Sequence, residues 1–130
     1  MAAQLSDTAK ALFDGTPFVS VATLQPDGSP QLSVVWAKMD GDDVLFSTVE
    51  GRRKHLNLVR DPRLTLMVNP ADAPYGYVEV RGEATLSTEN GRALIDELSQ
   101  RYLGKEYMAE PPETVRVVVR VTPHKVIERG

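Results

Sequence analysis

The stretch YGYVEVRGEATL, residues 75–86, decides the fold, because its side chains alternate more cleanly than those of any other segment. A period of two is typical of a β-strand with one buried face and one wetter face. Gly82 in the middle predicts a bulge or a sharp bend, as barrels use at their corners. Small or apolar positions alternate with bulkier, mostly polar ones: Val78, Val80, Gly82, Ala84 and Leu86 against Tyr77, Glu79, Arg81, Glu83 and Thr85.

Strand patterns continue on both sides of this stretch. The turn signals QPDGSP and DGDD join the first three predicted strands into two successive antiparallel hairpins. Helical patterns with start and stop signals interrupt the strands. Strands are predicted over 17–24, 31–39, 44–49 and 63–69 before residues 75–86, and over 114–122 and 124–129 after them, divided at Pro123; helices are predicted over 6–13, 51–60 and 88–103.

These elements predict a mainly β protein of about six to seven mostly antiparallel strands with short helices. The 130 residues fit a single domain, residues 1–130. A small split β-barrel suits this size, because closure removes exposed sheet edges. A β-sandwich is the alternative architecture. The helix over 88–103 would plug or flank the barrel.

Composition narrows the classes of function. The net charge of −3 argues against a general nucleic-acid coat, and the absence of cysteine excludes disulfides and thiolate chemistry. His55 and His124 are far apart in sequence, with no carboxylate at metal-ligand spacing, so we expect no metal site. No segment resembles a signal peptide or a membrane helix. We therefore expect a cytoplasmic protein without a membrane partner.

Three cations stand where the second predicted helix begins. Arg52, Arg53 and Lys54 follow Gly51 directly. A helix start carries partial positive charge, which disfavours a cation there by roughly 0.3–1 kcal/mol. A bound anion such as phosphate would reverse this, because it could meet free N–H groups and basic side chains together. Neutralisation by Glu50, or simple solvation of the cations, is the alternative.

Helical spacing separates the members of this cluster. Arg52 and Lys54 are two residues apart and do not share a helix face, so they converge only on an anion at the helix tip. Lys54 and Asn57 can line one side, whereas Arg53 faces elsewhere and is predicted to be solvated. Ser47 and Thr48, at the end of the preceding strand, can add hydroxyl groups.

Three segments together resemble a known family. VSVATLQPDGSPQLSVVW (19–36), FSTVEGRRKHLNLVRDPRLTLMV (46–68) and GYVEVRGEATL (76–86) are similar to the opening hairpin, the phosphate-binding segment and the long strand of the pyridoxamine-phosphate-oxidase-like split barrels. The resemblance covers most of the chain. Within that superfamily the chain is most similar to the branch that uses the deazaflavin coenzyme F420.

The resemblance implies a cofactor groove at a homodimer interface. It also implies hydride transfer from reduced F420 to an unsaturated small-molecule substrate, in which the cofactor supplies the reactivity. The sequence specifies neither a catalytic residue nor the substrate. By position, the implied cofactor residues are Arg52, Lys54, Ser47 and Thr48 at the phosphate with Asn57 in support, Gln31, Ser33 and Val34 near the ring, and Tyr77 at the groove's border.

Other interpretations stay open. FMN also carries one phosphate, so an FMN-binding oxidoreductase on the same barrel fits the same anchor. A non-catalytic carrier of flavin or deazaflavin is a second alternative, and a small interaction barrel with solvated cations is a third. Trp36, the only tryptophan, can either pack in the core or stack on a ligand.

Overall fold

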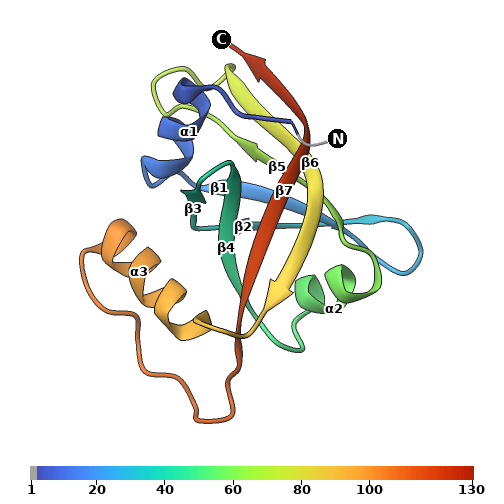
Figure 1. The fold of residues 1–130 in the computed structure, drawn as a ribbon, viewed down its shortest axis with the longest axis vertical. Helices are drawn as coiled ribbons and strands as arrows, with labels where there is room; N and C mark the ends of the chain where they lie inside the picture. The colour runs from blue at the N-terminus through green and yellow to red at the C-terminus, as the bar shows by residue number, and fades with distance from the viewer. Residues whose placement is uncertain (1–2) are drawn as a thin grey trace.

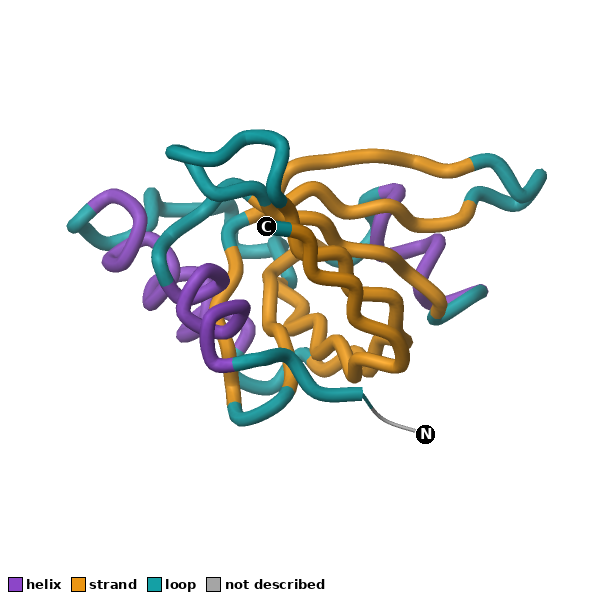
Figure 2. The backbone as a smooth tube through the Cα atoms, turned by 90° about the horizontal axis from the view of Figure 1, so that it is seen from above, coloured by secondary structure: helices purple, strands orange, loops and turns teal. Residues whose placement is uncertain are grey.

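The computed structural model describes residues 3–130, which form one seven-stranded antiparallel sheet curled into a split barrel with three helices outside it (Figures 1 and 2). The mainly β prediction is confirmed. The sheet order is β2-β1-β5-β6-β7-β4-β3. The elements are α1 (Asp7–Asp14), β1 (Val19–Leu24), β2 (Pro30–Val35), β3 (Ala37–Asp40), β4 (Asp43–Val49), α2 (Arg53–Arg60), β5 (Arg63–Val68), β6 (Tyr77–Ser87), α3 (Gly91–Leu103) and β7 (Arg116–Arg129).

The barrel closes through one interrupted strand. The predicted strand over 31–39 is wrong at Trp36, where β2 ends and β3 begins one residue later. β2 pairs with β1 and β3 pairs with β4, so the two strands lie at opposite edges of the sheet. The predicted succession of hairpins is therefore correct, but they do not form one continuous meander. The chain crosses from edge to edge because the sheet curls, which local sequence does not encode.

The predicted irregularity at Gly82 is confirmed. The pairing of β6 with β7 shifts register between Arg81 and Gly82, and Gly82 lies opposite Pro123. A Cβ atom at Gly82 would stand 2.3 Å from the carbonyl oxygen of Thr122, so only glycine fits this close approach. The predicted division of the last strand at Pro123 is wrong, because β7 runs from Arg116 to Arg129 and accommodates the irregularity as one extra residue, His124, between the paired Pro123 and Lys125.

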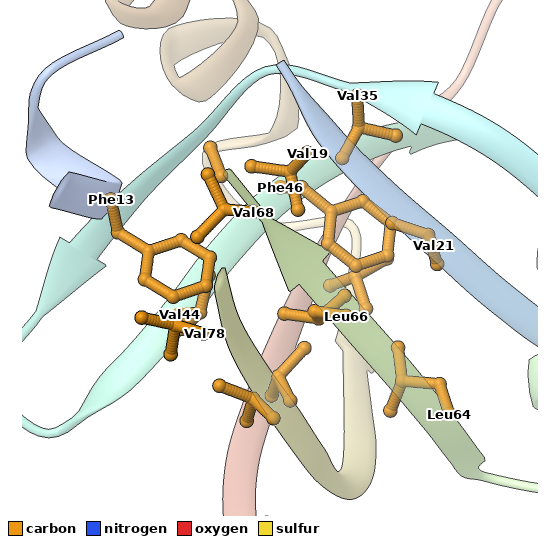
Figure 3. Packing of buried hydrophobic residues seen from close by; sticks show 14 of the residues in the cluster. Phe13, Val19, Val21, Val35, Val44, Phe46, Leu64, Leu66, Val68 and Val78 are labelled. Atoms are coloured by element: carbon orange, nitrogen blue, oxygen red, sulfur yellow. The ribbon is translucent and has the colours of Figure 1, made fainter. Parts of the chain in front are cut away.

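The barrel interior holds the main core (Figure 3). Inward positions of the strands alternate with outward ones, and α1 adds Phe13 from one end. Burying each such side chain contributes about 1.5–3 kcal/mol. The largest fully buried side chains of this core are Phe13, Phe46, Leu66, Val19, Val21, Val44, Val68, Val80, Val119 and Val121.

A second, smaller core fixes α3 outside the barrel. Leu94 and Leu98 of α3 pack with Leu45 from the outward face of β4, and Trp36 and Tyr102 border this cluster. The helix therefore flanks the barrel and does not plug it. It ends at Gly104, which adopts the left-handed conformation with φ of 74° expected of a helix-terminating glycine.

Candidate functional site

The start of α2 is the first component of the site. Gly51 adopts a φ of 92°, and its N–H group donates to Nδ1 of His55 at 3.1 Å. Arg52 precedes the helix in an extended conformation, and no side chain caps the helix. N–H groups in the first turn of a helix have no partner within the helix. The helix therefore presents unpaired donors together with basic side chains.

A cleft of about 290 Å³ lies beside this helix start. Its basic and polar end is made by Arg52, Lys54 and Ser47. The rest of its surface is apolar or aromatic, so the cleft joins a cationic end to a largely apolar body. These other lining residues are Phe18, Val34, Val35, Trp36, Ile95, Leu98 and Tyr107.

The cationic end has no compensating carboxylate. Within residues 3–130 neither Arg52 nor Lys54 forms an ion pair. Burial lowers the pKa of Lys54, and the charge of Arg52 lowers it further. The Nζ atom of Lys54 stands 5.9 Å from the centre of the Phe46 ring. Positive charge that is partly desolvated and unpaired favours an anionic ligand.

Of the residues next to Arg52 and Lys54, some line the cleft and others do not. Arg53 is exposed and does not line the cleft. Ser47 and Thr48 are adjacent in β4 and face opposite sides of it, as the alternation of a strand requires. Ser47 borders the cleft, whereas Thr48 is only 2% exposed and its Oγ1 has no hydrogen-bond partner in the described chain. The structure thus brings Ser47, but not Thr48, to the cleft.

Asn57 takes part in a buried polar chain behind the cleft. Its Nδ2 donates to Oγ1 of Thr23 at 3.1 Å, and Thr23 Oγ1 donates to Oε1 of Gln31 at 2.9 Å. Asn57 and Thr23 are fully buried. The chain ties α2 to the hairpin of β1 and β2, so it fixes the position of the helix start. Sequence reasoning missed Thr23, although it occupies an inward position after Val19 and Val21.

The remaining predicted residues lie at different places. Val34 lines the cleft and is 63% exposed. Ser33 is a neighbour on β2, and its buried Oγ has no hydrogen-bond partner in the described residues. Tyr77 pairs with Arg129 at the first position of β6 and does not line this cleft. The predicted approach of Ser33 and Val34 to a cofactor ring, and the predicted place of Tyr77 at the groove's border, stay predictions.

Three aromatic residues form one wall, and only Trp36 among them was a candidate from the sequence. Trp36 stacks on Tyr102 with ring centres 5.2 Å apart, and Tyr107 meets Trp36 edge-on at 6.2 Å. The Tyr102 hydroxyl accepts from the N–H of Ala37 at 3.0 Å and donates to the carbonyl oxygen of Pro17. Trp36 thus packs against the α3 cluster and also lines the cleft, and its stacking on a ligand stays a prediction.

Arg116 supports this wall from behind and was not foreseen. It is paired with Glu110 at 2.9 Å, and its side chain is only 6% exposed. Arg116 holds the pKa of the Glu110 carboxyl below its usual value. One signal was present in the sequence, since Arg116 is a charged residue at the start of a valine-rich strand.

Two further kinds of feature, a metal site and a membrane-spanning helix, find no support among residues 3–130. No cluster of three or more potential metal-ligating side chains occurs there. None of the helices described is long and apolar enough to span a bilayer.

The sheet of this chain curls into an antiparallel barrel, basic residues follow its fourth strand, and an apolar cleft lies beside them. These features place the chain in the class of split-barrel proteins. The comparison with protein families agrees with this class, since the family described as pyridoxamine 5'-phosphate oxidase matches residues 5–130. The chain belongs to this family of flavin-binding oxidoreductases. The resemblance inferred from the three segments is confirmed.

Two solved structures illustrate which proteins are similar to this chain. One described as an F420 reductase is 28% identical, covers 95% of this chain and 98% of its own, and superposes with a TM-score of 0.83. A conserved hypothetical protein from Mycobacterium tuberculosis is 22% identical over 98% of this chain and 86% of its own, with a TM-score of 0.78. The second likeness concerns the fold alone.

Proposed function

We propose that this protein is an F420-dependent oxidoreductase whose cofactor phosphate is anchored by Arg52 and Lys54. The observation that carries the proposal is the pair of cations without carboxylate partners at one end of an apolar, aromatic cleft. A phosphate would offset that charge and accept hydrogen bonds from both side chains. The 28% identical neighbour described as an F420 reductase favours the deazaflavin.

The chain's own residues would bind the cofactor and orient it. When bound, the deazaflavin supplies hydride transfer to an unsaturated organic substrate. Arg52, Lys54 and the hydroxyl of Ser47 would hold the phosphate end. Val34 and Trp36 would pack beside the ring and exclude water, which favours a fixed reactive geometry. The donor set thus fits a planar ring tethered to a phosphate.

A dimer would complete this arrangement. Phe18, Leu32 and Val34 are 73%, 70% and 63% exposed, and large exposed apolar side chains in a group mark interaction surfaces. Phe18 and Val34 also line the cleft, so the apolar face and the cleft are continuous. We propose that a second copy of the chain covers this face and closes the open side of the groove.

FMN is the second candidate cofactor. Its single phosphate can use the same cations, and the family binds flavins. A non-catalytic carrier of either cofactor would use the same cleft. The cytoplasmic location stays a prediction.

Titration of the purified protein with F420 and with FMN, followed by the fluorescence of each cofactor, tests the proposal. We expect micromolar binding of F420 and weaker binding of FMN. A hydrogen bond to a charged group contributes about 1.5–3 kcal/mol, so Arg52→Ala and Lys54→Ala should each bind F420 roughly ten- to a hundredfold more weakly. Arg53→Ala is the matched control, because it removes the same charge outside the cleft.

The outcomes separate the parts of the proposal. Undetectable F420 binding would remove the cofactor assignment. Normal binding by both Arg52→Ala and Lys54→Ala would remove the phosphate anchor, even with the correct cofactor. Tighter binding of FMN than of F420 would favour the flavin alternative.

A further inference from the structure

A buried guanidinium joins two hydroxyl groups at the cleft. Nη1 of Arg116 donates to Oγ of Ser47 at 3.3 Å, and Nη2 donates to the hydroxyl of Tyr107 at 3.1 Å. Glu110 receives the remaining hydrogen bonds, from Nε at 3.1 and 3.2 Å and from Nη2 at 2.9 Å. The charge of Arg116 is therefore compensated, which distinguishes it from Arg52 and Lys54. Its role at the cleft is orientation and not anion binding.

Tyr107 is held firmly for a residue in a connecting segment. The guanidinium of Arg116 lies 4.9 Å from the centre of its ring, and that of Arg92 lies 5.6 Å away. Nη2 of Arg92 also donates to the Tyr107 carbonyl oxygen at 3.0 Å. Trp36 contacts the ring edge-on. Three residues, Arg92, Arg116 and Trp36, thus contact the ring, and Arg92 also holds the backbone.

The Tyr107 hydroxyl keeps its own proton available. A hydroxyl group donates one hydrogen bond and accepts up to two. The Tyr107 hydroxyl accepts from Arg116, and no acceptor within residues 3–130 receives its proton. Because the residue lines the cleft, a ligand there can take the unused hydrogen bond.

Charge compensation limits the chemistry of that ligand. Arg116 is paired with Glu110, and Arg92 is paired with Asp96 and Glu110. If a phosphate takes Arg52 and Lys54, no unpaired charge remains at the cleft. The other lining side chains, Ser47 apart, are apolar or aromatic. An apolar site with one fixed donor favours a neutral acceptor and disfavours a charged molecule.

We propose that Tyr107 is a specificity-determining residue of this cleft. Its hydroxyl donates a hydrogen bond to an acceptor, such as a carbonyl oxygen, on a flat, uncharged ligand. Arg116 is the residue that positions Tyr107. The inference rests on the proposed function only in taking this cleft as the ligand site. It does not depend on which cofactor is bound.

A pair of matched probes tests the donor. 2-Acetylnaphthalene and 2-ethylnaphthalene share the same flat rings, but only the first carries a carbonyl acceptor. Their binding to the full chain is measured by equilibrium dialysis without cofactor, because the proposed F420 site lies in the same cleft. A net neutral hydrogen bond corresponds to about two- to tenfold in affinity, so the wild type should prefer the ketone by that factor. Tyr107→Phe should abolish the preference and leave affinity for 2-ethylnaphthalene unchanged.

The controls make the result specific. Tyr75→Phe removes a hydroxyl from a side chain that is 96% exposed and should keep the wild-type preference. The Arg116→Met and Glu110→Gln double variant keeps Tyr107 but removes the contacts that orient it. The ratio of the ketone's affinity to that of 2-ethylnaphthalene should therefore fall toward one. The ratio of the two affinities does not depend on the folded fraction, so a general loss of stability cannot imitate this effect.

Several results would overturn the inference. These are an unchanged preference in Tyr107→Phe, a wild type that does not distinguish the probes, and a cleft that binds neither probe. F420 affinity is measured in the same variants as a separate readout of the proposed function. Failure of F420 to bind any variant would count against the proposed function, while the probe ratio would still decide the role of Tyr107.

Discussion

Lys54 illustrates how a single residue can favour function over stability. Its charged form is partly desolvated, so its pKa in the folded chain lies below the ordinary value of 10.5. Between that lowered pKa and 10.5 the unfolded chain binds more protons, so this residue's contribution to stability becomes more favourable as pH rises through the window. Below the window the full cost of the buried charge is present.

Lys54→Met is therefore expected to raise the Tm of the ligand-free protein by a few degrees near neutral pH while weakening F420 binding. The gain should shrink as pH approaches about 10.5, because wild-type Lys54 then loses its charge. Thermal unfolding of both proteins across alkaline pH checks this expectation. A gain that grows with rising pH would contradict the assigned sign.

Asn57 separates a structural role from a direct contact. Asn57→Ala removes the buried hydrogen bond between α2 and Thr23, and such a bond contributes about 0.5–1.5 kcal/mol. We expect lower stability in urea unfolding and weaker F420 binding together, since the helix start would be less fixed. Thr23→Val breaks the same link and should act in the same direction. Weaker cofactor binding at unchanged stability would instead indicate direct contact with the cofactor.

At the level of elements, the register shift between β6 and β7 at Gly82 gives a sharp test. In Gly82→Ala the new methyl group would stand 2.3 Å from the Thr122 oxygen and 3.0 Å from its carbonyl carbon, and a backbone cannot yield as a side chain does. Forced backbone shifts of this kind typically cost 1–3 kcal/mol. Denaturant unfolding should show a loss of about that size. Gly130→Ala, where nothing lies within 4 Å, is the control and should be neutral.

Local patterns predicted those features that depend on neighbours in sequence. The alternation over 75–86 predicted β6, Gly82 predicted the irregular pairing there, and Gly104 predicted the end of α3. The same period of two would also have placed Ser47 and Thr48 on opposite faces, but proximity in sequence suggested a shared site. The break at Trp36 could not be predicted, because strand alternation continues across it: Val35 and Ala37 are both buried.

At the cleft, too, the sequence predicted features that depend on neighbouring residues and missed contacts between residues far apart in the chain. The cations of α2 were visible as a violation of the helix-start rule. The contact between Tyr107 and Arg116 depends on how a nine-residue separation folds back on itself, and that of Arg116 with Ser47 joins segments 69 residues apart. No local pattern encodes such contacts, because the first depends on the path of the segment between α3 and β7 and the second on the pairing of β4 with β7.

For the whole molecule, the exposed face of β2 predicts association. Val34→Asp would place a charge at the centre of the proposed interface, where its desolvation is unfavourable. We expect sedimentation at micromolar concentration to show a dimer for the wild type and a monomer for this variant, with weaker F420 binding and an unchanged fold by circular dichroism. Ala11→Asp adds the same charge to the exposed side of α1 and should remain dimeric. A wild type that sediments only as a monomer would remove the two-chain groove.

Trp36 sits at the junction where the chain passes from one sheet edge to the other, and it also lines the cleft. Since it is the only tryptophan, the chain's indole emission arises at that single place. Any molecule entering the cleft changes the surroundings of this one fluorophore, and a deazaflavin or flavin would also accept its excitation energy. The protein therefore carries an internal optical reporter of occupancy that needs no label.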